Sequence, residues 1–138
     1  MFASHKSSTM KIGTRQVNGI TVIDISGRIT LGEGDVLVRD MIGNLLAKGQ
    51  KRLLLNLAEV SYIDSSGIGA LVGAYTATRK QGGELQLLKI TNRVRNLLQI
   101  TKLYTVFVVS DEEDEAIRSL NLDSAAALPA VSLAGLAA

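Results

Sequence analysis

After a polar leader, the hydrophobic residues of the chain first gather in runs rich in residues that favour β-strands. Two such runs lie between Lys11 and Ile25 and flank Asn18-Gly19. This dipeptide accepts positive φ at both central positions of a type I′ turn, so the sequence predicts an antiparallel hairpin. The next stretch, Gly27 to Gly34, is interrupted by glycines and predicts a loop.

The middle of the chain changes from helical spacing to a continuous apolar run. Apolar residues from Val38 to Leu45 recur at helical intervals, and Gly49 follows where a helix often ends. Leu53 to Leu57 is almost uninterruptedly apolar, which is typical of a strand covered on both faces. We therefore expect a first helix followed by a central strand.

A strand-helix-strand unit comes next. The helix is expected to begin at Gly67 and to end at Gly82-Gly83, where the run Glu84 to Lys89 resumes as a strand. Strands joined in this way run parallel, with the helix packed across them.

The last elements are indicated mainly by capping residues. Thr91 or Asn92 can cap a third helix, and Thr105 to Val109 predicts a last strand. Ser110 and Glu113 form a capping-box pattern, in which the glutamate side chain bonds back to the cap residue. The order of all these elements implies an α/β domain with a mixed sheet.

Length and composition indicate one domain. The chain has 138 residues, of which 46% are hydrophobic, and its formal charge of +2 does not require a nucleic-acid or membrane partner. It has no cysteine, and its one histidine, His5, lies in a polar leader. Polar residues interrupt the C-terminal segment, which falls short of the about 20 apolar residues that cross a membrane. We expect a flexible leader over 1–9, a domain over 10–120, an Ala- and Leu-rich tail over 121–138, and a cytoplasmic location.

The most informative segment joins the end of the central strand to the second helix. Its core is Asp64-Ser65-Ser66-Gly67, and Gly69 follows closely. Asp64 or a serine could cap the helix by accepting a backbone N–H. Alternatively, free N–H groups and the positive helix end would stabilise a phosphate attached to a serine here. The glycines would let a kinase reach the hydroxyl, although tight helix packing explains them equally well.

Three segments together resemble the STAS domain of bacterial anti-sigma-factor antagonists. They are Leu55-Asn56-Leu57, Ile63 to Leu71 with its Asp-Ser-Ser-Gly core, and Gly82-Gly83-Glu84-Leu85. The resemblance covers residues 10–120 and implies a mixed β-sheet packed against about four helices on one side. It also implies a signalling protein that works by partner switching and is not an enzyme.

By this resemblance, Ser66 is the phosphate acceptor and Ser65 is its neighbour. In the family, the unphosphorylated antagonist binds an anti-sigma factor, which is itself a serine kinase, and so releases a sigma factor for transcription. Phosphorylation abolishes this binding, and a phosphatase restores it. The residues expected to bind the partner are Thr30, Asp64, Ser65, Ser66, Gly67, Ile68 and Gly69.

One position departs from the family. Antagonists commonly carry an acidic residue where this chain has Thr30, after Gly27-Arg28-Ile29. Contacts near the phosphorylation site are therefore expected to differ from those of other members, unless Thr30 is simply a loop residue.

A second function within the same fold remains open. STAS modules also serve as scaffold subunits of stress-signalling complexes and as accessory subunits of membrane transport systems. Ser66 would then be a cap or a contact residue without phosphate, and the Ala- and Leu-rich tail would suit docking to a fixed assembly.

Other functions lack the residues they need. A serine hydrolase would require a Gly-x-Ser-x-Gly elbow and a fixed histidine, whereas His5 lies in the leader. The glycines match neither a Walker loop nor a dinucleotide fingerprint, so we expect no cofactor and no metal. Arg93, Arg95 and Lys102 are spread along one predicted helix and aromatics make up only 4% of the chain, so direct nucleic-acid binding is not indicated.

Overall fold

A computed structural model of the chain describes residues 10–122. The predicted leader, residues 1–9, and residues 123–138 of the predicted tail lie outside this described part. Residues 121 and 122 still belong to a helix, so the folded unit extends beyond the predicted boundary at 120.

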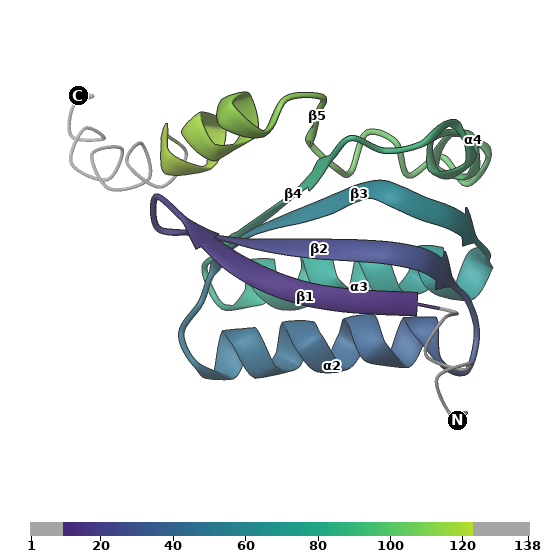
Figure 1. The fold of residues 1–138 in the computed structure, drawn as a ribbon, viewed down its shortest axis with the longest axis horizontal. Coiled ribbons are helices and arrows are strands. Elements are labelled where there is room, and N and C mark those ends of the chain that lie inside the picture. The colour runs from purple at the N-terminus through teal and green to yellow at the C-terminus, as the bar shows by residue number, and fades with distance from the viewer. Residues whose placement is uncertain (1–9, 123–138) are drawn as a thin grey trace.

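Five strands form one mixed sheet in the order β1-β2-β3-β4-β5 within the described residues (Figure 1). Antiparallel pairing joins the first two strands, and each later strand runs parallel to its neighbour. The strands are β1 (Met10–Val17), β2 (Ile20–Ile29), β3 (Arg52–Ile63), β4 (Glu84–Leu88) and β5 (Val109–Ser110). The predicted hairpin is confirmed, with Asn18 at φ 50° and Gly19 at φ 83°.

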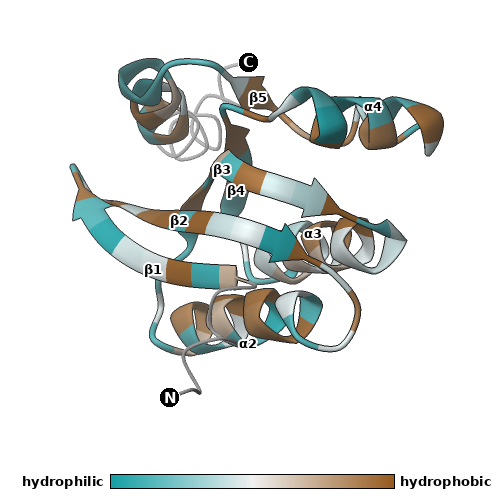
Figure 2. Cartoon of the chain, turned by 45° about the vertical axis from the view of Figure 1, so that its right-hand side comes forward, coloured by the Kyte–Doolittle hydropathy of each residue, from teal (hydrophilic) through white to brown (hydrophobic). Residues whose placement is uncertain are grey.

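Helices cover both faces of the sheet. They are α2 (Gly34–Ala47), α3 (Ser65–Lys80) and α4 (Asn92–Ile100), followed by a last helix over residues 113–122. Hydrophobic residues concentrate on the central strands, and the helices carry both hydrophobic and hydrophilic residues (Figure 2). The helices therefore have an apolar side to bury and a polar side to leave in water.

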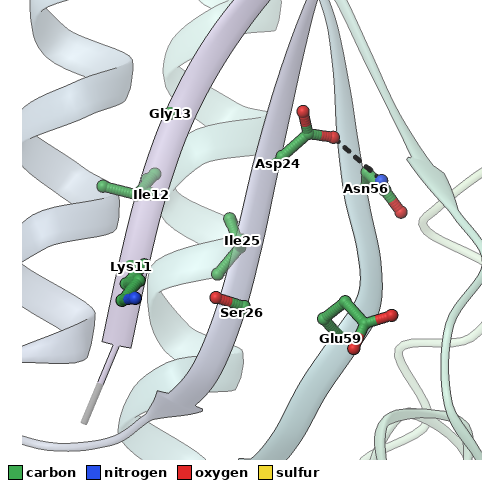
Figure 3. A pocket seen from close by; sticks show the side chains of 8 residues that line it. All are labelled: Lys11, Ile12, Gly13, Asp24, Ile25, Ser26, Asn56 and Glu59. Atoms are coloured by element: carbon green, nitrogen blue, oxygen red, sulfur yellow. Dashed lines mark hydrogen bonds between the residues drawn. The ribbon is translucent and has the colours of Figure 1, made fainter. Parts of the chain in front are cut away.

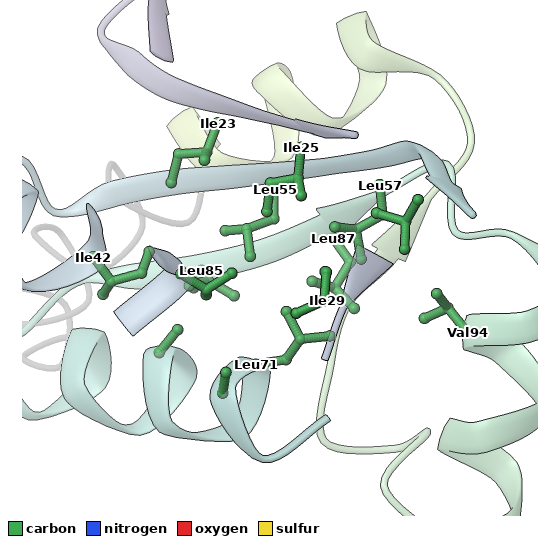
Figure 4. Close-up of a cluster of buried hydrophobic side chains, with 14 of the residues drawn as sticks. Ile23, Ile25, Ile29, Ile42, Leu55, Leu57, Leu71, Leu85, Leu87 and Val94 are labelled. Carbon is green, nitrogen blue, oxygen red and sulfur yellow. The ribbon is translucent and has the colours of Figure 1, made fainter. Parts of the chain in front are cut away.

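The main core lies between the sheet and the pair α2 and α3. Figure 4 shows Leu55, Leu85 and Leu71 among the side chains that fill this space. Apolar burial of this kind is the dominant favourable contribution to folding. It fixes the carboxyl ends of the parallel strands beside the N-terminus of α3.

The last helix packs on the opposite face of the sheet. It contributes Ala116, Ile117 and Leu120 to a second cluster with Ile20, Val22, Leu54 and Leu88. The α/β class and the mixed sheet agree with expectation, but the helices do not all lie on one side. The reason is that β2, β3 and β4 are apolar on both faces at this end, so each face needs a cover.

Helix boundaries follow the predicted capping residues at several points. Gly49 has φ 84° and its N–H donates to the carbonyl of Leu46, so it ends α2 as predicted. Gly82 ends α3 in the same conformation, with φ 80°. Thr91 caps α4 by accepting the N–H of Val94 at 3.3 Å.

Three predicted boundaries are wrong. Strand β2 runs through Gly27 to Ile29, because each of these residues still pairs with β3. The last strand contains only Val109 and Ser110 and not the segment from Thr105, because the chain turns at Leu103–Val106 and buries Phe107. The helix predicted to begin at Gly67 begins two residues earlier, at Ser65.

The predicted capping box at the last helix is also wrong. The last helix begins at Glu113, so Ser110 is not its N-cap, and the carboxylate of Glu113 instead accepts two hydrogen bonds from Arg15 on β1. Within residues 10–122, no helix is long and apolar enough to cross a membrane.

Candidate functional site

The turn between β3 and α3 is built around Asp64. Its Oδ1 accepts the N–H of Gly67 at 2.9 Å, which makes Asp64 the N-cap of α3. Its Oδ2 accepts the N–H of Leu31 at 3.2 Å. One carboxylate therefore fixes the first turn of α3 and the loop that follows β2.

Ser65 and Ser66 occupy the first two positions of α3. Ser65 is exposed and Ser66 is half-buried. Among the described residues, no hydrogen bond engages either hydroxyl or either backbone N–H of these serines. Free donors at the positive end of a helix form a favourable environment for an anion.

Gly67 is required by a close backbone approach. A Cβ atom at this position would lie 2.2 Å from the carbonyl oxygen of Ile29 and 2.6 Å from Cγ1 of Ile63. A side chain therefore cannot be accommodated without moving the end of β2. The sequence suggested kinase access or tight packing as the reason for this glycine. The close approach of Ile29 and Ile63 shows that tight packing requires Gly67.

Gly69 has a different environment. A Cβ atom there would meet only Nη2 of Arg39, at 3.9 Å, and the residue is exposed. Gly69 thus leaves the surface of α3 open one turn beyond Ser66.

The loop after β2 is held by Asp35, which is buried. Its Oδ1 accepts the N–H of Gly32 at 2.9 Å, and its Oδ2 accepts a hydrogen bond from Arg39 at 3.0 Å. Burial would raise the pKa of this carboxyl, but the hydrogen bonds from Arg39 and the backbone outweigh it and lower the pKa. The carbonyl of half-buried Thr30 accepts the N–H of Asp35 at 3.0 Å, so Thr30 helps to begin α2.

The exposed edge of α3 is made of small residues. Before the exposed C-terminal residues Arg79 and Lys80, it consists of Ser65, Gly69, Gly73 and Thr76, and we call these four residues the exposed edge of α3. Leu31 is 74% exposed and is tied to the start of this edge through Asp64. An exposed leucine beside a row of small residues is suited to a partner that presents its own apolar side chains.

Two of the predicted contact residues do not face solvent. Gly67 is buried beneath Ile29, and Ile68 is only 3% exposed in the main core. Gly67 and Ile68 therefore shape the turn from inside and are not part of its exposed surface. Thr30, Asp64, Ser65, Ser66 and Gly69 remain at or near the surface at the same end of the sheet.

A polar cluster that the sequence did not predict lies on the face of the sheet opposite α2 and α3. Arg15 donates to both oxygens of Asp24, at 2.7 and 3.1 Å, and to both oxygens of Glu113, at 2.9 and 2.7 Å. These bonds lower the pKa of both carboxyls and raise the pKa of the guanidinium. Asn56 also donates to Asp24, at 2.8 Å.

This cluster borders an open hollow of about 310 Å³ (Figure 3). Its lining includes Lys11, Ser26 and Glu59, with the Asp24 and Asn56 pair at one end. Because the lining carries both positive and negative side chains, the hollow shows no preference for one class of ligand. In residues 10–122, no group of three acidic or histidine side chains is arranged to hold a metal ion.

Comparison with known proteins agrees with the mixed-sheet fold. Residues 11–116 match the model of the STAS domain, and the chain belongs to this family. The anti-sigma-B factor antagonist of Bacillus subtilis (strain 168) is 28% identical over 109 residues, which cover 79% of this chain and 98% of that protein. The anti-sigma-B factor antagonist of Staphylococcus aureus (strain COL) is 31% identical over 84 residues, covering 58% and 78% respectively.

Solved structures support the same fold. The anti-sigma factor antagonist SpoIIAA in its unphosphorylated form has a TM-score of 0.69 at 23% identity, covering 80% of this chain and 96% of that chain. The Bacillus protein SpoIIAA in its phosphorylated form has a TM-score of 0.64 at 22% identity, covering 79% and 98%. At this level of identity the likeness establishes the fold alone.

Proposed function

We propose that this protein is an anti-sigma-factor antagonist whose partner binding is switched off by phosphorylation of Ser66. The observation that carries the proposal is the position of Ser66 in the first turn of α3, where the neighbouring N–H groups are unengaged. The names of the curated relatives support the same function. The partner is an anti-sigma factor with serine kinase activity, and a phosphatase reverses the modification.

The proposed switch acts by charge at a preformed surface. A phosphoserine adds about −1.5 to −2 charges at pH 7, which is a large change beside the uncharged edge of α3. The free N–H groups of Ser65 and Ser66 would stabilise that charge, so the domain would stay folded. The negative charge of Asp64 lies next to it, and the two charges together would repel an acidic partner surface. Burying them against an apolar partner surface would be unfavourable because they would lose their hydration.

In this proposal the chain is a ligand and a kinase substrate and performs no catalysis. Among the described residues, no histidine, lysine or carboxylate is hydrogen-bonded to the Ser66 hydroxyl, as a serine nucleophile would need. The folded domain, close to the expected 10–120, would be sufficient for binding in the cytoplasm, where a sigma factor acts.

Calorimetric titration with the purified serine-kinase anti-sigma factors of the host tests the proposal. Wild type and Ser66→Ala should bind one of them, and Ser66→Asp should bind it at least about tenfold more weakly, a change of about 1.4 kcal/mol. Thr14→Asp is the matched control, because it adds the same charge at an exposed position on β1. Equal binding by Ser66→Asp and wild type would favour a phosphate-independent scaffold or transport-subunit role.

A further inference from the structure

Two arginines contact one tyrosine ring at the carboxyl end of the sheet. The guanidinium carbon of Arg28 lies 4.7 Å from the ring centroid of Tyr62, and that of Arg93 lies 4.1 Å from the same centroid. Both distances are within the range of a cation-π interaction, in which the negative face of the ring attracts a cation. We call these three residues the Arg-Tyr-Arg stack.

The stack and the serine turn lie at the same end of the sheet. Arg28 on β2 pairs with Tyr62 on β3, and the next pair along these strands is Ile29 with Ile63. The carbonyl of Ile29 is the group against which Gly67 packs. Arg93 enters from the first turn of α4, which lies above the end of β3 in Figure 1. The stack and the Ser66 turn therefore lie at the same end of β2 and β3. Because successive side chains of a strand point to opposite faces, the stack lies on the face that meets α4, whereas Ile29 and Ile63 face the main core and α3.

The two positive charges of the stack have no carboxylate partner in the described part of the chain. Ion pairs there involve Arg15, Arg39 and Arg79, and none involves Arg28 or Arg93. Both side chains are exposed, whereas Tyr62 is half-buried. Holding two like charges at one ring is unfavourable by Coulomb repulsion, and a nearby anion would relieve it.

We propose that the Arg-Tyr-Arg stack binds carboxylate side chains on an acidic segment of the protein that covers the Ser66 turn. The inference rests on the proposed function, because it assigns a second contact to the same partner. Guanidinium groups donate paired hydrogen bonds to carboxylates, and stacking on Tyr62 orients them before the partner arrives. Complementary charge of this kind sets the orientation and the rate of association.

Acetyl-hexaglutamate amide serves as a defined acidic probe. Titrated into labelled protein, it should shift the side-chain Nε–Hε resonances of Arg28 and Arg93 more than those of Arg95 and Arg118, and added salt should reverse the shifts. A matched acetyl-hexaserine peptide should produce no such shifts. Equal shifts at all four arginines would overturn the proposal.

Matched double variants test the role in partner binding. The double variant Arg28→Gln with Arg93→Gln should bind the anti-sigma factor about tenfold more weakly than wild type. Each lost exposed charge is expected to weaken binding about threefold, and the two effects multiply. Lys48→Gln with Lys80→Gln removes the same charge at the C-terminal ends of α2 and α3 and should leave the affinity within about twofold.

The outcomes separate this inference from the proposed function. Unchanged affinity of the arginine double variant, with normal binding by wild type, overturns the inference and leaves the switch proposal intact. Lack of binding by wild type to every anti-sigma factor overturns the proposed function, and the hexaglutamate titration still decides whether the stack recognises carboxylates.

Discussion

Asp64 and Leu31 are joined by a hydrogen bond of 3.2 Å from the Leu31 N–H to a carboxylate oxygen. The other oxygen of Asp64 caps α3 through Gly67, at 2.9 Å. Asp64 therefore positions both Leu31, the exposed apolar residue in the loop after β2, and the serine turn. This link joins two parts of the proposed contact surface that are far apart in the sequence.

Asp64→Ala should destabilise the domain by about 1–2 kcal/mol, because the N-cap bond and the tie to Leu31 are lost together. Asp64→Asn should lose less, since an asparagine oxygen can still cap the helix. Urea unfolding measures both values. Equal loss in the two variants would contradict the capping role of Asp64.

Gly67 and Gly69 should respond oppositely to the same change. Gly67→Ala places a methyl group 2.2 Å from the carbonyl of Ile29 and should cost at least about 1–3 kcal/mol. Gly69→Ala meets nothing closer than 3.9 Å and should be neutral or up to about 1 kcal/mol stabilising, because alanine favours a helix interior. Thermal unfolding of the pair checks the prediction, and similar melting temperatures would contradict it.

Stability should fall in acid through the cluster at Arg15. The pKa values of Asp24 and Glu113 are lowered from their ordinary 3.8 and 4.5, so the unfolded chain binds protons more readily than the folded one. Their contribution is complete above these ordinary values and is lost as pH falls through the lower folded-state values. Both groups are partly exposed, so the contribution is about 1 kcal/mol or less for each pair.

Arg15→Gln is the control for this pH dependence. It should lower stability at pH 7 and flatten the decline between about pH 5 and pH 2, because both carboxyl groups then titrate nearly as they do in the unfolded chain. Urea unfolding across this range measures the slope. An unchanged slope would contradict the role of Arg15.

Bulk on the exposed edge of α3 should block the partner without unfolding the domain. Gly69→Arg projects a long side chain from this edge and should weaken anti-sigma-factor binding at least about tenfold. Gly43→Arg on α2 is the matched control, because Gly43 is exposed and, apart from its neighbours and the backbone of its own helix, no described atom lies within 4 Å of its Cβ position. Calorimetry and melting temperature distinguish lost binding from lost folding, and equal binding by both variants would contradict the assigned edge.

Local signals in the sequence were sufficient to predict much of the fold. Asn18-Gly19, Gly49 and Thr91 determine backbone geometry or caps within a few residues, and each lies where predicted. The serine turn was predictable for the same reason. The short last strand was not, because the burial of Phe107 depends on the assembled core.

Contacts between distant segments could not be derived from local patterns. Arg15 and Glu113 are separated by 98 positions, and the acidic run that contains Glu113 fits a helix N-terminus when it is considered alone. The Arg-Tyr-Arg stack likewise joins residues from two strands and a helix. Charge and aromatic content indicate that such contacts are possible, but only the fold determines which residues meet.

The most direct test of the central claim is to locate the phosphate. The purified protein is incubated with ATP and each serine-kinase anti-sigma factor of the host, and intact-mass analysis with fragmentation then identifies the modified residue. The account predicts a single phosphate on Ser66, none on Ser66→Ala, and loss of anti-sigma-factor binding by the modified protein. A phosphate on Ser65 or elsewhere, or full binding by protein phosphorylated on Ser66, would contradict it.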